Sequence, residues 1–278
     1  MIPQHLVSGW MYSLTRCRWQ PLKNLLIRYV IHQYRVDMTA ACEPDYRAYN
    51  SFNDFFTREL KHGARPLAGA DDQVICPVDG SISQIGGINH SEIFQAKGHA
   101  YDLASLLAGD AELAAGFQDG AFATLYLSPR DYHRIHMPLT GRLQQMLYVP
   151  GRLFSVNNAT TSTVPGLFAR NERVISIFQT GSGLMAVILV GAIFVGSMET
   201  VWEGQITPAR DRQLRRWDYS APGRTIELAR GDELGRFNMG STVILLFEKG
   251  RIEWLEELKA DDTVVMGQPL GQLLATSY

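Results

Sequence analysis

The chain has 278 residues, of which 46% are hydrophobic and 19% are charged, and its formal net charge is −2 at pH 7. This length and composition predict one large globular unit, alone or with a small addition, and exclude a disordered chain. A net charge near zero argues against a nucleic-acid binder. The cysteines, Cys17, Cys42 and Cys76, are scattered without a CxxC spacing, so we expect a reducing compartment and neither a disulfide framework nor a zinc site.

The N-terminal segment is basic and rich in aromatic residues. Residues 1–36 contain five Lys or Arg and no Asp or Glu. From Pro21, apolar residues recur at helical spacing (Leu22, Leu25, Leu26, Tyr29 and Val30), which predicts a helix that Pro21 opens. Such a helix either lies in a membrane interface, held by anionic lipids, or packs on its own domain or in a dimer. The charge imbalance favours the membrane.

No segment of the sequence is long and apolar enough to predict a membrane span. The longest apolar stretch, Leu184–Val195, contains Gly191 and is shorter than a bilayer requires, so we expect a buried strand there. Arginines interrupt the apolar residues near the N-terminus, and we expect no signal peptide.

After the basic segment, Ser51–Leu60 predicts a short helix with Ser51 as its N-cap and Asp54 at the third position. From about residue 74 the pattern becomes β-rich, with Gly or Pro between most segments. We expect short helices at Leu103–Leu107 and Ala111–Phe117. The candidate strands are Val74–Cys76, Ser81–Ile85, Ala121–Leu127, Leu143–Val149, Val174–Gln179, Met185–Val195, Thr225–Leu228, Val243–Phe247 and Val264–Leu274. The predicted class is therefore α+β, with N-terminal amphipathic helices followed by a mostly antiparallel β-rich core.

Two of the segments with candidate chemistry carry an acid and a pair of histidines. Asp79 lies in Pro77-Val78-Asp79-Gly80, between an apolar run and a glycine, where most Asp-Gly pairs are only turns. In Ser128–Pro138, Ser128 followed by Pro129 predicts a single helical turn that puts His133 and His136 on one face. Two such histidines can act as general base and substrate contact, or be purely structural. An HxxH pair without a third ligand does not predict a metal site.

The third segment is Gly240-Ser241, which stands between a polar turn and the apolar run Val243–Phe247. A serine hydroxyl can attack the glycine carbonyl before it and turn the amide into an ester. Loss of the serine α-proton then cleaves the chain, and hydrolysis leaves a pyruvoyl group. With Asp79 and His136, Ser241 forms a set in which histidine takes the hydroxyl proton and aspartate orients the imidazole. The sequence has neither a GxSxG elbow nor a P-loop.

Many segments in a fixed order resemble one family, the bacterial membrane-associated phosphatidylserine decarboxylases, along nearly the whole chain. Met239 stands where that family usually has Leu, a volume-conserving change. The matching segments are Phe52–Arg58, Arg65-Pro66, Pro77–Gly80, Asp131–Pro138, Tyr148–Gly151, Asn171–Arg173, Val190–Ala192, Val195–Ser197, Gly231–Phe237 and Gly240–Thr242.

The resemblance implies a self-cleaving, pyruvoyl-dependent enzyme. Asp79, His136 and Ser241 would form the self-cleavage triad, and Ser241 would become the covalent pyruvoyl cofactor, without metal or pyridoxal phosphate. The pyruvoyl group would form a Schiff base with the amine of phosphatidylserine and accept electrons as CO₂ leaves, giving phosphatidylethanolamine. His133 would assist substrate handling or decarboxylation. Cleavage between Gly240 and Ser241 would give fragments 1–240 and 241–278 that stay associated.

The same resemblance sets the expected organisation and partners. We expect a helical, membrane-associating segment at 1–62 and a catalytic domain at 63–278. The expected site of action is an anionic membrane surface, peripherally, at the cytoplasmic face of the cell membrane. A homodimer is left open, and nucleic acid is not an expected partner. Two rival hypotheses are a serine hydrolase that uses Asp79, His136 and Ser241 on an intact chain, and a non-catalytic lipid-surface protein.

Overall fold

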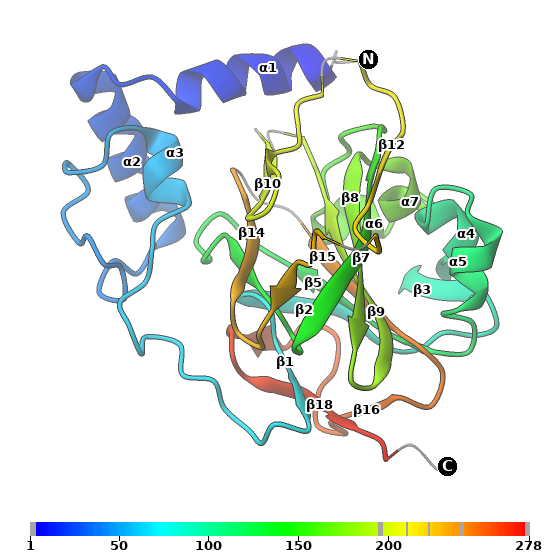
Figure 1. Cartoon of the computed structure of the whole chain (residues 1–278). Coiled ribbons are helices and arrows are strands. Elements are labelled where there is room, and N and C mark those ends of the chain that lie inside the picture. The colour runs from blue at the N-terminus through cyan, green and yellow to red at the C-terminus, as the bar shows by residue number, and fades with distance from the viewer. Residues whose placement is uncertain (1–3, 194–196, 210, 222, 239–241, 276–278) are drawn as a thin grey trace.

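The structure is a computed structural model that describes residues 4–193, 197–209, 211–221, 223–238 and 242–275. Its largest element is a nine-stranded sheet in which neighbouring strands run antiparallel (Figure 1). The order is β12-β7-β8-β9-β15-β5-β2-β17, and β13 also pairs with β7. The strands are β2 (Gly80–Gly87), β5 (Ala121–Tyr126), β7 (Gly141–Val149), β8 (Arg173–Thr180), β9 (Gly183–Val190), β12 (Arg215–Asp218), β13 (Glu227–Leu228), β15 (Thr242–Phe247) and β17 (Thr263–Val264).

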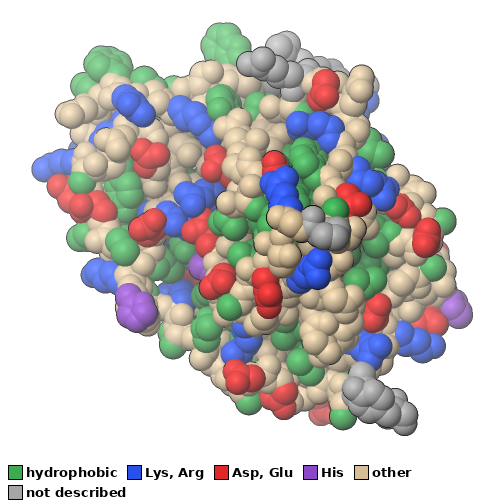
Figure 2. Space-filling view, viewed as in Figure 1, with side chains coloured by type: hydrophobic (Ala, Val, Ile, Leu, Met, Phe, Trp, Pro, Cys, Tyr) green, Lys and Arg blue, Asp and Glu red, His purple; other side chains and the backbone are tan. Residues whose placement is uncertain are grey.

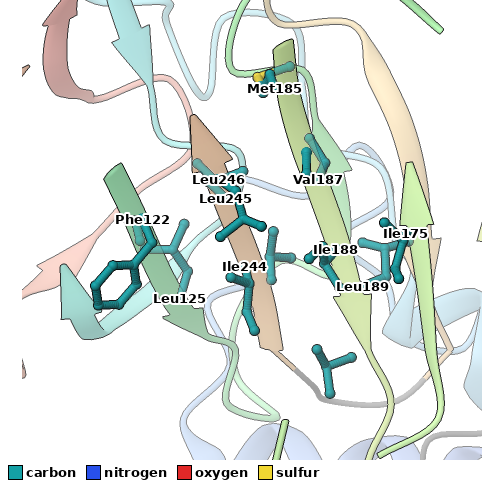
Figure 3. Packing of buried hydrophobic residues seen from close by; sticks show 14 of the residues in the cluster. Phe122, Leu125, Ile175, Met185, Val187, Ile188, Leu189, Ile244, Leu245 and Leu246 are labelled. Atoms are coloured by element: carbon teal, nitrogen blue, oxygen red, sulfur yellow. The ribbon is translucent and has the colours of Figure 1, made fainter. Parts of the chain in front are cut away.

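Strand β15 lies in the middle of this sheet and forms the centre of the core. All six of its residues are buried, and it pairs residue by residue with β9 on one edge and β5 on the other. Figure 3 shows Ile244, Leu245 and Leu246 between side chains of these two neighbours. Apolar and β-branched residues in an unbroken run are typical of a strand covered on both faces.

A four-stranded sheet carries the segment that precedes β15. Its order is β11 (Gly204–Gln205), β10 (Met198–Thr200), β14 (Glu233–Phe237) and β6 (Arg134–His136), again antiparallel. β14 and β15 follow one another in the chain but belong to different sheets. The chain therefore changes sheets between Phe237 and Thr242, where the Gly240-Ser241 pair falls.

Smaller elements complete the β-rich part. A three-stranded sheet holds β1 (Gln73–Ile75), β18 (Pro269–Leu273) and β16 (Ile252–Trp254), and β3 (Glu92–Ala96) pairs with β4 (His99–Asp102). Four short helices are α4 (Leu103–Leu106), α5 (Ala111–Ala115), α6 (Asn158–Thr161) and α7 (Leu167–Arg170). Among them α4, α5 and α7 gather at one side of the main sheet (Figure 1). The mostly antiparallel α+β class predicted from the sequence is confirmed.

The N-terminal helices are α1 (Gln4–Thr15), α2 (Gln20–Tyr34) and α3 (Phe52–Phe56). In Figure 1, α2 and α3 lie on the side opposite α4, α5 and α7, and α1 runs across the top of the view. The helix predicted from Pro21 is confirmed as α2, and the Ser51 cap is confirmed because its hydroxyl accepts the Asp54 N–H at 3.1 Å. Residues of α2 and α3 share a hydrophobic cluster of their own, separate from the main core, that includes Ile27, Phe55 and Phe56. A domain boundary between residues 62 and 63 stays a prediction.

The helical turn predicted at Ser128–Pro138 is wrong. The Asp131 carboxylate accepts hydrogen bonds from the N–H and hydroxyl of Ser128, both at 2.7 Å, which closes a tight turn. The chain then extends, because Arg134–His136 pair with β14. Residues three apart in an extended segment point to opposite sides, so His133 and His136 do not lie on one face as expected.

Other predicted elements differ at their ends. The strand expected at Val264–Leu274 is broken, because the chain turns at Gly267, whose φ is +87° and whose added Cβ would lie 2.6 Å from the Pro66 carbonyl oxygen. The strand expected to reach Val195 ends at Val190, after which the Gly191 N–H donates to the Glu172 carbonyl. The helix expected to reach Leu60 ends at Phe56. Helix α1 falls within the helical segment expected at 1–62, but its bounds were not predicted.

Candidate active site

Asp79 lies between β1 and β2, where the chain packs closely against β5. A Cβ on the next residue, Gly80, would lie 2.2 Å from the Tyr126 carbonyl oxygen, so only glycine permits this approach. The Asp79 carboxylate is almost fully buried and accepts hydrogen bonds from Arg65 Nε at 2.9 Å, from Arg65 Nη2 at 2.5 Å and from the Met266 N–H at 2.9 Å. Asp79 is therefore held as a bidentate ion pair with Arg65.

His136 is the last residue of β6 and is held at both ring nitrogens. Its Nδ1 lies 2.7 Å from the Gly231 carbonyl oxygen, and its Nε2 lies 3.0 Å from the Tyr132 hydroxyl. Because a carbonyl only accepts, we assign the proton to Nδ1, which leaves Nε2 as the acceptor. Burial lowers the pKa of His136 below its ordinary value of 6.5. The imidazole is therefore a neutral base near pH 7.

His133 is fully buried on the other side of this segment. Its Nδ1 donates to the Asp131 carbonyl at 2.8 Å, and its ring centroid lies 4.0 Å from that of Phe56. Its Nε2 has no hydrogen-bond partner among the described residues. Burial lowers the pKa of His133 to about 3. A buried acceptor without a partner is uncommon in a folded protein, and a catalytic role is one explanation for it.

The structure brings the Asp79 and His136 segments together without a hydrogen bond between the two side chains. The His136 N–H donates to the Pro77 carbonyl at 2.9 Å, which places β6 beside the segment that carries Asp79. Arg65 and Met266 occupy the carboxylate, while Gly231 and Tyr132 occupy the imidazole. The negative charge of Asp79 still raises the pKa of His136, though less than burial lowers it.

Gly240 and Ser241, the predicted cleavage site, lie outside the described residues, but both flanks are described. On one side the Phe237 N–H donates to the His133 carbonyl at 3.0 Å, three residues before Gly240. On the other side Thr242 begins β15, is fully buried, and its hydroxyl has no partner among the described residues. The histidine segment therefore contacts the chain just before the predicted cleavage site.

A cavity of about 220 Å³ adjoins Asp79 and Tyr132. Four arginines line it, against three aspartates. Arg58 is 4% exposed, and it donates from Nη2 to the carbonyls of Arg130 and Asp131 at 3.2 and 3.4 Å. Its Nε and Nη1 have no hydrogen-bond partner among the described residues. With four arginines against three aspartates in its lining, the cavity is suited to an anion. The charged lining residues are Arg35, Arg58, Arg65, Arg130, Asp37, Asp79 and Asp131.

The sequence patterns predict no role for Arg58, Arg65 or Tyr132. All three lie inside or beside segments used for the family resemblance, so their positions were visible but their contacts were not. Arg65 reaches Asp79 across 14 residues, a separation without periodicity to reveal it. Across the described part of the chain, no three His, Cys, Asp or Glu side chains cluster as metal ligands would.

Buried neutral imidazoles, in a segment whose Asp131 and Tyr132 line an arginine-rich cavity, indicate an enzyme that acts on an anionic compound. A family model described as phosphatidylserine decarboxylase matches residues 52–272, and one described as PSD matches residues 1–35. The phosphatidylserine decarboxylase proenzyme of Ectopseudomonas mendocina (strain ymp) is 56% identical over 272 residues, which cover 98% of this chain and 95% of the relative. That of Acidovorax ebreus (strain TPSY) is 53% identical, with 97% and 94% covered. The chain belongs to the phosphatidylserine decarboxylase family.

Proposed function

We propose that this protein cleaves itself between Gly240 and Ser241 and then decarboxylates phosphatidylserine to phosphatidylethanolamine. The observation that carries the proposal is the pairing of β6 with β14. This pairing brings the two histidines against the strand that leads into the Gly240-Ser241 pair. The pyruvoyl group derived from Ser241 would supply the electron sink that decarboxylation of an amino acid requires.

His136 is the proposed base for self-cleavage. Its Nε2 is the acceptor of the ring and would take the Ser241 hydroxyl proton, in the place where the Tyr132 hydroxyl now donates. Gly231 holds Nδ1 and so fixes the tautomer. Asp79 supports the resulting imidazolium through its charge, since it already raises the pKa of His136. Arg65 holds that carboxylate in place through its hydrogen-bonded ion pair.

His133 is the proposed residue for the decarboxylation step. It is neutral near pH 7 because burial lowers its pKa to about 3. Its Nε2 is free to accept a proton from the substrate amine or to return one to the carbon that loses CO₂. The fully buried setting around Phe56 keeps water away from this atom.

The arginine-lined cavity is the proposed site for the anionic head group. Phosphatidylserine carries a phosphodiester and a carboxylate, and both match the flat donor array of a guanidinium. Arg58 lines this cavity, and its Nε and Nη1 have no hydrogen-bond partner among the described residues. Arg65 is committed to Asp79 at 2.5 Å, which leaves Arg58 as the main candidate for direct contact.

The N-terminal helices are the proposed contact with an anionic membrane surface. Trp10 is 82% exposed and Trp19 is 65% exposed, and Leu25 and Tyr29 are exposed on α2. Figure 2 shows hydrophobic side chains projecting at the edge where Figure 1 places α1. Exposed aromatic and basic residues together suit a membrane interface. No helix in the described part of the chain is long and apolar enough to cross a bilayer.

Intact mass spectrometry with a hydroxylamine probe, combined with CO₂ release from phosphatidylserine vesicles, tests the proposal. We expect two fragments that meet at Gly240 and Ser241. The smaller should react with the probe and be lighter, by one ammonia, than the unmodified 241–278 peptide. Ser241→Ala should stay in one piece and release no CO₂, while Ser220→Ala, an exposed serine elsewhere, should behave as wild type. An intact wild-type chain labelled at Ser241 by an active-site phosphonate would indicate a hydrolase instead.

A further inference from the structure

Asn238 is a buried polar residue at the end of β14, two positions before Gly240. It is 1% exposed, and all of its side-chain hydrogen-bonding groups are used. Its Nδ2 donates to the Ser197 hydroxyl and, at 2.6 Å, to Glu199 Oε1, while its Oδ1 accepts from Asn53 Nδ2 at 3.0 Å. Its backbone N–H donates to the Ser197 carbonyl at 2.9 Å. A fully paired amide in a buried place fixes the direction of the chain around it.

The partners of Asn238 come from the N-terminal helices as well as from the β core. Asn53 belongs to α3. Arg16 directly follows α1 and donates from Nη2 to the same Ser197 hydroxyl at 3.1 Å, and this nitrogen lies 3.8 Å from Glu199 Oε1. Two N-terminal helices are thus connected by side-chain hydrogen bonds to the residue that leads into the Gly240-Ser241 pair.

The opposite flank of that pair is held by strand pairing in the main sheet. Thr242 pairs with Tyr126 of β5 and with Val190 of β9. The β sheet thus fixes the chain after Ser241, and the network around Asn238 fixes it before Gly240. Attack of a serine hydroxyl on the preceding carbonyl needs both flanks in register, since a misplacement of about 1 Å can cost about 100-fold in rate.

We infer that Asn238 is a positioning residue for self-cleavage, and that the N-terminal helices act through it to align the scissile segment. This inference rests on the proposed self-cleavage. It gives α1 and α3 a task inside the processing reaction, beyond contact with a membrane. The network does not touch the reacting atoms through any described contact, so its effect is on geometry.

The test follows cleavage of the full chain over time after a short pulse of cell-free synthesis. Asn238→Asp removes both donors and brings a carboxylate against Glu199, so we expect cleavage to slow by about ten- to 100-fold. Adding Glu199→Gln supplies a donor to that carboxylate, and the double variant should recover most of the rate. Arg16→Ala and Asn53→Ala should each slow cleavage several-fold. Tyr12→Phe is the matched control, because it removes only the Tyr12–Gln205 hydrogen bond between α1 and β11.

Thermal unfolding of the same variants, each built on Ser241→Ala to keep one chain, separates positioning from folding. Slow cleavage in Asn238→Asp with rescue by Glu199→Gln and an unchanged unfolding midpoint supports the inference. Wild-type cleavage rates in Asn238→Asp and Asn53→Ala overturn it and leave the proposed function intact. Loss of rate strictly in step with loss of stability, without rescue, also overturns it. Failure of the wild-type chain to cleave overturns the proposed function and the inference with it.

Discussion

The two sides of the Gly240-Ser241 pair are held by opposite kinds of interaction. After the pair, β15 is an apolar strand with six buried residues and two antiparallel neighbours. Before it, Asn238 is held by an amide, a hydroxyl and a carboxylate from two separate segments, α3 and the start of β10. Apolar burial is strong but has little direction, whereas hydrogen bonds add little net stability and specify orientation. The strand after the pair thus contributes stability, and the hydrogen bonds before the pair fix the orientation of the chain.

Substitution of the two histidines tests this comparison most directly, since both lie next to the hydrogen-bonded flank before Gly240. His136→Ala should slow self-cleavage by about 10²–10⁴-fold, because the base for the Ser241 hydroxyl is lost. His133→Ala should cleave at close to the wild-type rate and decarboxylate poorly. Gel analysis of processing and CO₂ release from phosphatidylserine vesicles measure the two effects. Full processing of His136→Ala would remove that residue from the mechanism.

The apolar flank should respond in stability. Leu245→Ala, made in the uncleaved Ser241→Ala chain, should lower the free energy of unfolding by about 2–5 kcal/mol, because Leu245 is fully buried at the centre of the sheet. Urea unfolding followed by circular dichroism measures the loss. Leu214→Ala is the matched control, since Leu214 is 49% exposed. Equal losses in the two variants would contradict a core held at β15.

Because buried His133 is neutral in the folded chain, the free energy of unfolding should fall at acidic pH. Its pKa is about 3 when folded and 6.5 when unfolded, so between these values the unfolded chain binds a proton that the folded chain does not. Stability from this group is complete above pH 6.5 and falls by about 1.4 kcal/mol per pH unit below it. In the Ser241→Ala chain, His133→Asn should lack this slope, and the exposed His62→Asn should keep it. Parallel stability curves for both variants would place the cause elsewhere.

Substitutions on the outer face of the N-terminal helices should weaken membrane binding and leave both flanks of the Gly240-Ser241 pair in place. Trp10→Ser combined with Trp19→Ser should weaken binding to anionic vesicles by about ten-fold, which corresponds to about 1.4 kcal/mol of lost apolar contact. Cleavage should stay at the wild-type rate, since neither side chain belongs to the network around Asn238. Leu274→Ser, at an exposed position outside these helices, is the control for vesicle sedimentation. Unchanged binding in the double variant would move the membrane contact elsewhere.

The sequence predicted the parts of the fold that local patterns determine. The Ser51 cap, α2 and the apolar strands β8 and β15 follow from spacing and composition within each segment. The turn at Ser128–Pro138 failed because Arg134–His136 take their conformation from β14, about 100 residues away. A distant pairing partner leaves no periodic signal in a three-residue strand.

The sequence predicted which residues belong to the candidate site, but it did not predict the contacts between them. Asp79, His133 and His136 were named from their motifs and the family resemblance. Arg65 as the partner of Asp79 and Tyr132 as the partner of His136 emerged only from tertiary packing. The amide network of Asn238 likewise joins residues up to 185 positions apart. Side-chain pairing over such separations depends on the whole fold, which no local motif encodes.

The central place of β15 also makes unfolding of the cleaved protein difficult to reverse. Before cleavage, the strand enters the sheet as part of a single chain, so its local concentration is set by a tether of a few residues. After cleavage, a strand that had left would have to return from dilute solution and insert between β9 and β5, two strands that could close on each other. The two fragments of the mature protein would therefore stay associated for a long time. Once separated, they would reassemble inefficiently. The lifetime of the mature protein would be governed by the rate of unfolding, and an unfolding and refolding cycle should show hysteresis.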